Sequence, residues 1–473
     1  MHETERSTTT ERITTGVRGV DLVLGGGFVA GSVQLVVGHP GAGKTIFANQ
    51  FAFHLAKAGH SAVYVTLLAE SHARMLTHLG GFTFFDPEMV SRRILYMSGH
   101  SVLDQAGLDG LLELLTRTIR ENSASLLIID GLNTAKEFAE TTTSFKRFLL
   151  RLATSASLTN CTTLLISLHP EPTRTEPEMG TVDGIVRLEK RLHGSRVVRE
   201  LSVDKMRATF YALGMHAFDI DEHGLHVYPR IESMRLKNGP KTRSQRRLEF
   251  GVEGLDAMLG GGVAEGSTTG LIGPPGTGKT LLGSCFLATG LGYDEKALYV
   301  GLRESPEHVM QQGRGIGLYL DEPLARGLLK VLWFPALETS IDALAWELLD
   351  QIAHEGIKRV FIDGIDTVGT MFVYPERLPR FCTALITRLG NLGCTTIIAE
   401  STQAQVRDSI AVNAADNVLV LREALRLGRV TRLITAQKRQ GGQHEISPRR
   451  LQISNRGLFV GARRWWLFNE DKP

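Results

Sequence analysis

Gly38-His39-Pro40-Gly41-Ala42-Gly43-Lys44-Thr45 is the stretch that decides the fold of this chain, because it matches the phosphate-binding pattern GxxxxGK[ST]. An apolar run at 33–37 precedes it and a stretch of helical spacing at 46–58 follows it, as such a loop requires. The glycines let backbone N–H groups wrap phosphate oxygens, and the helix N-terminus favours anions. We predict nucleotide binding by Gly41, Ala42, Gly43, Lys44 and Thr45, with Lys44 on the outer phosphates and Thr45 on Mg²⁺.

The same loop occurs a second time, as Gly273-Pro274-Pro275-Gly276-Thr277-Gly278-Lys279-Thr280, directly after the apolar run 268–272. Two matches in the same context argue against a glycine-rich turn that fits the pattern by chance. The second loop is therefore also predicted to bind nucleotide, through Gly276, Thr277, Gly278, Lys279 and Thr280.

Both loops belong to a larger internal repeat. The segment 15–27 recurs as 250–262, and the loop lysines Lys44 and Lys279 are separated by the same offset along the chain. Further along, two apolar strands end in Asp130 and Asp363, whose separation is almost the same as that of the lysines. This nearly constant offset indicates that the chain consists of two homologous halves.

Each half alternates apolar strands with amphipathic helices. The run 62–65 is typical of a strand, and the stretches 108–120 and 341–353 carry apolar residues at helical spacing. Such alternation predicts an α/β fold with a mainly parallel sheet and helices on both faces. The later runs 185–188 and 197–203 have the pattern of antiparallel strands, which predicts a small antiparallel extension of the sheet.

The repeat also predicts the domain boundaries. We expect a disordered N-terminus at 1–12, a first nucleotide-binding domain at 13–234, a basic linker at 235–247 and a second domain at 248–473. The linker, RLKNGPKTRSQRR, is interpreted as a solvated connection, with a nucleic-acid contact as the alternative. Near the C-terminus, Trp465 and Trp466 are expected to pack on the second domain, with partner docking as the alternative.

Composition favours a cytoplasmic protein. The net charge of +3, from 53 basic and 50 acidic side chains, is too small to indicate a nucleic-acid partner. The four cysteines form no CxxC pair and are expected to be reduced core thiols. The polar first residues predict no signal peptide, and no apolar run approaches the ~20 residues that span a bilayer.

Four acidic residues are candidates for the chemistry of phosphate transfer. Asp130 and Asp363 each end an apolar strand and precede a glycine, which suits a carboxylate that holds the Mg²⁺ shell. Although this pattern also occurs in β-turns, its recurrence after both loops favours the metal role. Glu70 and Glu304 follow neighbouring strands and are predicted to orient the attacking water. Both precede a serine, so a helix N-cap is the alternative.

Together these motifs resemble the KaiC-like ATPases, double-domain relatives of the RecA and DnaB motor fold, from about residue 12 to residue 460. The repeated GVxGxDxxLGGG segment, both loops, the Glu-Ser and Asp-Gly strand ends and Lys205-Met206-Arg207-Ala208-Thr209 occur in the family's order. The resemblance implies tandem RecA-like domains in a homo-hexameric ring, with ATP and Mg²⁺ between subunits. It also implies that Lys205 and Arg207 reach the neighbour's γ-phosphate, with Thr209 nearby.

The second half departs from the family's finger residues. Lys438 aligns with Lys205, but Gln440 occupies the position of Arg207. Arg439 is the candidate replacement, although adjacent residues of a strand point to opposite faces.

Two further departures concern catalysis. The family carries two adjacent glutamates before the serine, whereas Ala69 and Arg303 occupy the first of these positions here. Clock members of the family carry a phosphorylated Ser-Thr pair at the place of Val412 and Asn413, and these two residues cannot accept phosphate. The resemblance therefore implies ATPase chemistry without the autokinase cycle.

The leading hypothesis is an ATP-hydrolysing ring whose nucleotide state controls its assembly and a signalling partner. The alternatives are a Ser/Thr autokinase or protein kinase, a DNA-dependent RecA-like motor, and a scaffold that binds ATP with little hydrolysis. The weak net charge favours the ATPase over the DNA motor.

Overall fold

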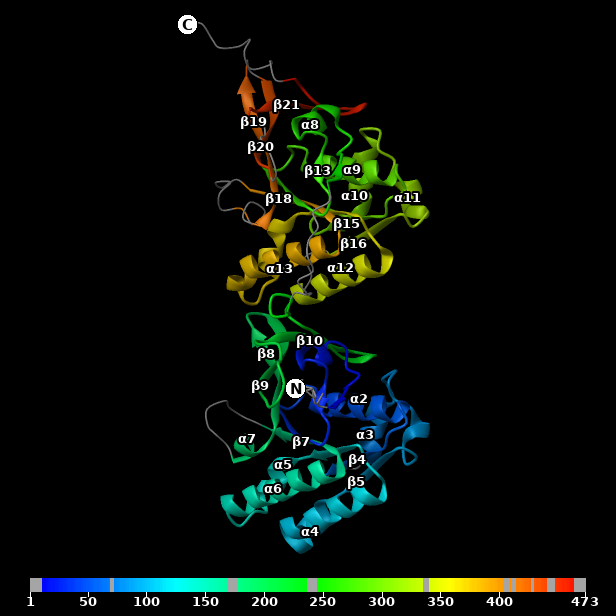
Figure 1. Cartoon of the computed structure of the whole chain (residues 1–473), viewed down its shortest axis with the longest axis vertical. Coiled ribbons are helices and arrows are strands. Elements are labelled where there is room, and N and C mark those ends of the chain that lie inside the picture. The colour runs from blue at the N-terminus through cyan, green and yellow to red at the C-terminus, as the bar shows by residue number, and fades with distance from the viewer. Residues whose placement is uncertain are drawn as a thin grey trace, which may run out of the picture. The chain divides into compact units, whose positions relative to one another are not determined.

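The computed structural model describes residues 11–68, 72–168, 177–235, 245–334, 340–402, 409, 414–426, 429–439 and 447–462. The chain divides into two compact units, Met1–Met234 and Arg235–Pro473, which follow each other along the colour bar of Figure 1. Within the described residues, each unit contains one nine-stranded sheet and one two-stranded sheet.

The large sheet of the first unit has the strand order β11-β10-β9-β8-β3-β7-β6-β4-β5. The strands are β1 (Arg12–Ile13), β2 (Phe28–Val29), β3 (Val33–Gly38), β4 (Ala62–Thr66), β5 (Ile94–Ser98), β6 (Leu126–Asp130), β7 (Thr162–Leu168), β8 (Gly184–His193), β9 (Arg196–Met206), β10 (His216–Asp221) and β11 (Gly224–Tyr228). The helices are α1 (Val20–Val23), α2 (Lys44–Lys57), α3 (His72–Leu79), α4 (His100–Glu121), α5 (Leu132–Glu137), α6 (Thr142–Thr159), α7 (Pro177–Thr181) and the 3-10 turn Pro87–Met89.

Helices cover both faces of this sheet (Figure 1). Alternate residues of β6 belong to different cores, because successive side chains of a strand point to opposite faces. Leu126 and Ile128 pack in the cluster that contains the apolar residues of α2. Leu127 and Ile129 pack in a second cluster with the leucines of α4 and the phenylalanines of α6. Burial on both faces explains why the central strands are continuous apolar runs.

The second unit repeats this arrangement with the order β16-β15-β17-β18-β14-β19-β20-β21-β22. Its strands are β12 (Arg247–Leu248), β13 (Val263–Ala264), β14 (Thr268–Gly273), β15 (Ala297–Gly301), β16 (Leu329–Trp333), β17 (Arg359–Asp363), β18 (Thr395–Ser401), β19 (Asn417–Arg426), β20 (Arg429–Lys438), β21 (Arg449–Ser454) and β22 (Gly457–Val460). Its helices are α8 (Glu253–Met258), α9 (Lys279–Leu291), α10 (Pro306–Arg314), α11 (Asp321–Ala325), α12 (Ile341–Glu355), α13 (Leu378–Asn391) and the 3-10 turns Ile365–Met371 and Pro375–Arg377.

The predicted fold class is confirmed in both units. Six strands of each large sheet are parallel, from β5 to β8 in the first unit and from β16 to β19 in the second. The expected antiparallel pair is β8 and β9, although β8 itself runs parallel to β3. The extension then continues through β10 and β11, and the second unit has the same three antiparallel pairings.

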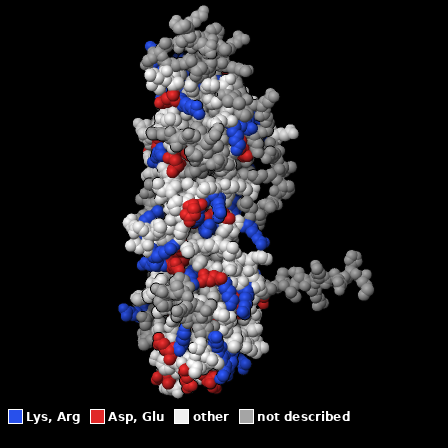
Figure 2. Space-filling view, turned by 90° about the vertical axis from the view of Figure 1, so that its left-hand side faces the viewer, with Lys and Arg blue, Asp and Glu red and all other residues white. Residues whose placement is uncertain are grey.

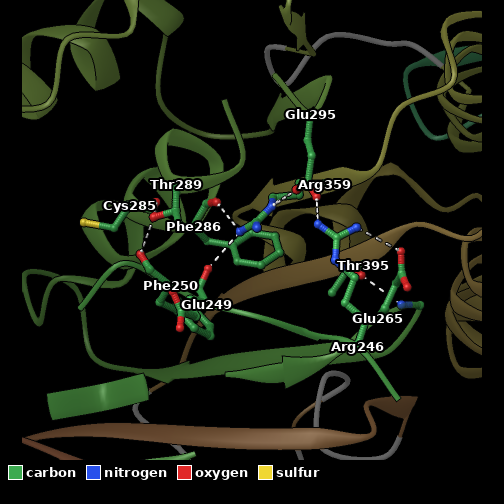
Figure 3. A network of polar contacts seen from close by, with 11 residues as sticks. Arg246, Glu249, Phe250, Glu265, Cys285, Phe286, Thr289, Glu295, Arg359 and Thr395 are labelled. Atoms are coloured by element: carbon green, nitrogen blue, oxygen red, sulfur yellow. Dashed lines mark hydrogen bonds and ion pairs between the residues drawn. The ribbon is translucent and has the colours of Figure 1, made fainter. Parts of the chain in front are cut away.

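A buried polar network distinguishes the second unit from the first. The side chain of Arg359, at the start of β17, is 1% exposed, and its Nε donates to Glu295 at 2.7 Å. Its Nη1 donates to the carbonyls of Glu249 and Phe286, and its guanidinium lies 4.6 Å from the Phe286 ring centroid (Figure 3). Glu295 also pairs with Arg246. In the first unit, the buried Leu126 holds the position of Arg359 in the repeat.

All four cysteines are buried and free. Burial raises the pKa of Cys161, Cys285, Cys382 and Cys394 to about 12, so these thiols are protonated at neutral pH. Among the helices in the described ranges, none is long and apolar enough to cross a membrane.

Candidate nucleotide sites

Each phosphate-binding loop leaves the carboxyl end of the central strand of its sheet. In the first unit, β3 ends at Gly38 and α2 begins at Lys44. Gly43 precedes the helix with a φ of 100°, and a Cβ there would lie 2.7 Å from the side chain of Ile220. The loop therefore needs glycine at this position for both its backbone conformation and the available space.

The second loop has the same construction between β14 and α9. Gly278 has a φ of 100°, and a Cβ there would lie 2.9 Å from the side chain of Ile453. Gly41 and Gly276 also have positive φ, and a Cβ on either would meet no atom within 4 Å. The space beside these two glycines is therefore open and leaves room for a ligand. Ala42 and Thr277, between the glycines, are buried and fix the loops to the protein.

The loop lysines are held by their own loops. Lys44 Nζ donates to the carbonyls of Gly38 at 2.6 Å and His39 at 2.9 Å. Lys279 Nζ makes the equivalent bonds to Gly273 at 2.8 Å and Pro274 at 2.7 Å. Burial lowers the pKa of both amines, and the charges of Asp130 and Asp363 partly offset this effect. An anion above the loop would stabilise both ammonium groups.

The first site has the parts expected of a Mg²⁺-nucleotide site. Thr45 Oγ1 lies 3.4 Å from Asp130 Oδ2, so the hydroxyl and the carboxylate face the same point. Both line a cavity of about 690 Å³, together with Lys44 and Gly43. Hydroxyl and carboxylate oxygens are the ligands that Mg²⁺ prefers beside phosphates. The residues of this cavity therefore fit Mg²⁺ and a nucleotide.

A tyrosine that sequence reasoning missed also contacts this site. Tyr64 Oη donates to Asp130 Oδ2 at 2.6 Å. Burial raises the pKa of the phenol, as does the Asp130 carboxylate, so Tyr64 stays a donor at neutral pH. The sequence contained a signal, because Tyr299 is the counterpart of Tyr64 in the repeat and occupies the same buried strand position.

The second site contains Thr280, Asp363 and Glu304 in a similar arrangement. Asp363 accepts a hydrogen bond from Thr280, and burial raises the pKa of Asp363 to about 6. Asp363 Oδ2 and the Tyr299 hydroxyl are both buried without a hydrogen-bond partner among the described residues. The orphaned oxygen of Asp363, together with the Thr280 hydroxyl bonded to the same carboxylate, fits a metal ligand set. Glu304, the predicted water-orienting residue, accepts from Gln312 Nε2 at 2.9 Å. Glu70, its counterpart in the first half, lies outside the described residues.

A pair of residues beside each loop differs between the sites. In the second site, Arg303 forms an ion pair with Asp366, whose Oδ1 accepts from the backbone N–H of Ser401 at 3.0 Å. In the first site, Asn133 Oδ1 accepts from the equivalent backbone N–H of Leu168 at 2.8 Å. The first half has one extra residue before its Glu-Ser pair, so Leu68 occupies the position of Arg303 in space, although Ala69 directly precedes the glutamate. Both Leu68 and Arg303 lie over the glycine that follows the strand aspartate.

The predicted finger residues do not lie at their own loop. Lys205 on β9 pairs with Ile185 of β8, which pairs with Leu35 of β3. Lys205 is thus level with a residue that precedes Gly38 by roughly 10 Å along the strand. Lys205 Nζ donates to the carbonyl of Val182 at 2.7 Å. Arg207, which follows the end of β9, is 58% exposed and lies 3.4 Å from Asp183.

The remaining predicted residues lie at or just after the ends of β9 and β20. Thr209 Oγ1 accepts from Arg12 Nη2 at 3.0 Å. Lys438 Nζ donates to the carbonyl of Ala415 at 2.6 Å, which repeats the contact of Lys205 with Val182. Arg439 lies against Gly260, and burial together with Arg247 lowers the pKa of its guanidinium. Gln440, Val412 and Asn413 lie outside the described residues.

The comparisons with known proteins agree with this geometry. The family described as "ATPase: KaiC" matches residues 13–232 and 248–464, which cover both sheets and both loops. The chain belongs to the KaiC ATPase family. This KaiC family member is 26% identical over 467 residues to the circadian clock oscillator protein KaiC of Picosynechococcus sp., covering 95% of this chain and 89% of the relative. It is 25% identical over 464 residues to the KaiC of Nostoc sp., covering 94% and 88%.

Membership of the family explains the duplicated sites and implies nucleotide binding. Bound Mg²⁺ would neutralise charge on the nucleotide phosphates. Thr45 and Asp130 would hold it in the first site, and Thr280 and Asp363 in the second. The KaiC family member thus has two loops of the same construction, with different side chains around them.

Proposed function

We propose that this protein is a Mg²⁺-dependent ATPase that assembles into a homo-hexameric ring, with ATP bound between adjacent subunits. The observation that carries this proposal is the position of Lys205 and Arg207 at the opposite end of the sheet from their own loop. We infer that they complete a site on another subunit. A heterologous interface that closes on itself provides such a shared site in every subunit.

The surface around Arg207 supports a contact with a neighbour. Phe210 and Leu213, which follow the finger residues, are 81% and 68% exposed. Large apolar side chains exposed together are typical of protein interfaces. Arg207 extends from the same loop, so burial of Phe210 and Leu213 by a second subunit would bring its guanidinium to that subunit.

We infer that the nucleotide state controls ring assembly and, through it, a cytoplasmic signalling partner. Nucleotide that bridges two subunits stabilises the assembled form by mass action. The relatives named above are clock oscillator proteins, which agrees with a signalling role for the nucleotide state. Val412 and Asn413 stand where a phosphoacceptor pair would be needed, so ATP hydrolysis is proposed in place of autophosphorylation.

The decisive experiment measures mass in solution with and without Mg-ATP, together with phosphate release. It compares wild type with Lys44→Ala and Lys279→Ala. We expect ATP to drive assembly of a six-subunit ring, and Lys44→Ala to abolish most of the turnover. A monomer that releases no phosphate under any condition would overturn the proposal. Transfer of labelled phosphate from ATP to this chain or to an added protein substrate would show a kinase instead.

The surface gives less support to a DNA-dependent motor. On the face shown in Figure 2, basic side chains lie interspersed with acidic ones. A nucleic-acid channel requires a groove of positive charge that follows the phosphate backbone. Stimulation of phosphate release by DNA would reverse this conclusion.

A further inference from the structure

The second site has a cation, Arg303, at a position where the first site has Leu68. Arg303 belongs to the same chain as the loop, unlike a residue supplied by a neighbouring subunit. Arg303 follows β15, next to the strand that ends in Asp363. The backbone N–H of the preceding residue, Leu302, donates to the carbonyl of Asp363 at 3.0 Å. These contacts place the Arg303 backbone beside the predicted metal ligand.

The partner of Arg303 is tied directly to the phosphate-binding loop. Arg303 pairs with Asp366, and Asp366 accepts from the backbone of Ser401 at 3.0 Å. Ser401 of β18 is the register partner of Gly273, the first residue of the loop. Arg303 therefore lies close enough to act on a phosphate bound there.

The equivalent positions of the first half carry no charge. Leu68 replaces Arg303 and Asn133 replaces Asp366, while the hydrogen bond to the next strand is kept. The second half thus has a cation and a carboxylate together where the first half has neither. The carboxylate of Asp366 neutralises the charge of Arg303 when no anion is bound. The half that carries this cation is also the half in which Gln440 stands at the position of Arg207.

Arg303 can leave Asp366 at little cost. Its side chain is 43% exposed and that of Asp366 is 22% exposed. Solvent-exposed ion pairs contribute only about 0–1 kcal/mol. A guanidinium binds phosphate in a fork of two hydrogen bonds, as it can a carboxylate, and a terminal phosphate carries more negative charge than the single charge of Asp366. A terminal phosphate on the loop can therefore compete with Asp366 for Arg303.

We propose that Arg303 binds the γ-phosphate of the nucleotide on its own loop, and that the second site thereby selects nucleoside triphosphates over diphosphates. This rests on the proposed nucleotide binding by the second half. Without a triphosphate, Arg303 pairs with Asp366. When a triphosphate binds, its γ-phosphate replaces Asp366 as the partner of Arg303. The cation is supplied in cis, so this selectivity does not require a neighbouring subunit.

The test measures binding of a nonhydrolysable ATP analogue and of ADP, both with Mg²⁺, to full-length protein that carries Lys44→Ala. Arg303→Leu installs the residue of the first half. We expect Arg303→Leu to weaken binding of the ATP analogue about 10-fold or more, where each tenfold corresponds to about 1.4 kcal/mol. The affinity for ADP should change less than about twofold. Asp366→Asn should increase the affinity for the ATP analogue, because no ion pair has to be broken when the analogue binds.

Arg314→Leu is the matched control. Arg314 is 53% exposed and also pairs with an aspartate, Asp321, within the second unit. It should leave both affinities unchanged. Equal weakening of analogue and ADP by Arg303→Leu would overturn the proposal, because Arg303 would then only support the local fold. No change in either affinity would also overturn it. If the Lys44→Ala protein binds neither nucleotide, the nucleotide-binding role of the second half fails instead.

Discussion

The two halves of this chain share a scaffold and differ in the polar pairs placed on it. Both have the same strand order and the same loop geometry. The first half has an uncharged pair, Leu68 and Asn133, where the second has Arg303 and Asp366. The hydrogen bond of Tyr64 to Asp130 also has no equivalent at Tyr299 among the described residues. A duplicated fold thus kept its backbone while its side chains changed in pairs, which is how two sites of one chain can acquire different roles.

The largest expected difference between the halves concerns the finger residues. Arg207→Ala should lower phosphate release about 10³-fold, because a trans arginine stabilises the charge that develops on the transferred phosphate. Lys438→Ala should have a much smaller effect, because Gln440 stands in the second half at the position of Arg207. The measurement is phosphate release by purified rings at saturating Mg-ATP.

A mixing experiment tests whether Arg207 acts on a neighbour. Arg207→Ala and Lys44→Ala proteins should each retain only a small residual rate of phosphate release when assayed alone. Mixed rings should recover part of the activity, because an intact Lys44 then meets an intact Arg207 across some interfaces. If mixing restores nothing, or if Arg207→Ala is fully active, the shared site is wrong.

The second comparison concerns the buried charge at the start of β17. Arg359→Ala should cost about 3–5 kcal/mol of unfolding free energy in the second half, because it leaves Glu295 without its buried partner. Arg359→Leu, which copies Leu126 of the first half, should cost less because it fills the space. All four tryptophans lie in the second half, so urea unfolding followed by tryptophan fluorescence reports on this half alone. Equal costs for the two variants would show that volume, and not charge, decides the stability here.

The third comparison concerns the two strand tyrosines. Tyr64→Phe removes a hydrogen bond to a carboxylate, worth about 1.5–3 kcal/mol. It should raise the Mg²⁺ concentration needed for half-maximal phosphate release about 10-fold. Tyr299→Phe is the matched control and should leave nucleotide binding by the second half unchanged, because its hydroxyl is buried without a partner among the described residues. Similar effects of both substitutions would remove the distinction between the two sites.

The sequence predicted the scaffold better than the side-chain pairs. Apolar runs, helical spacing and two glycine-rich loops were enough to predict a mainly parallel sheet with alternating strands and helices, because these patterns are local. The contacts that distinguish the halves are not local. Arg303 and Asp366 are 63 residues apart, and Arg359 and Glu295 are 64 residues apart. Only the strand register brings them together, so the sequence could show that Arg303 departs from the family and not which residue it contacts.

The smallest expected difference is in the response to acid. Burial raises the pKa of Glu295, but the hydrogen bonds and charges of Arg359 and Arg246 outweigh this and hold it below its ordinary value of 4.5. A carboxylate whose pKa is lower in the folded state stabilises the protein above its unfolded pKa, and this contribution is lost as the pH falls through the folded pKa. Between about pH 6 and pH 3, the free energy of unfolding of the second half should therefore fall on the order of 1 kcal/mol less in Arg359→Leu than in wild type. The first half has His60 and Leu126 at the two positions, so it lacks this contribution. Tryptophan-detected urea midpoints with the same pH dependence in both proteins would show that the network in Figure 3 does not contribute to the acid sensitivity of the second half.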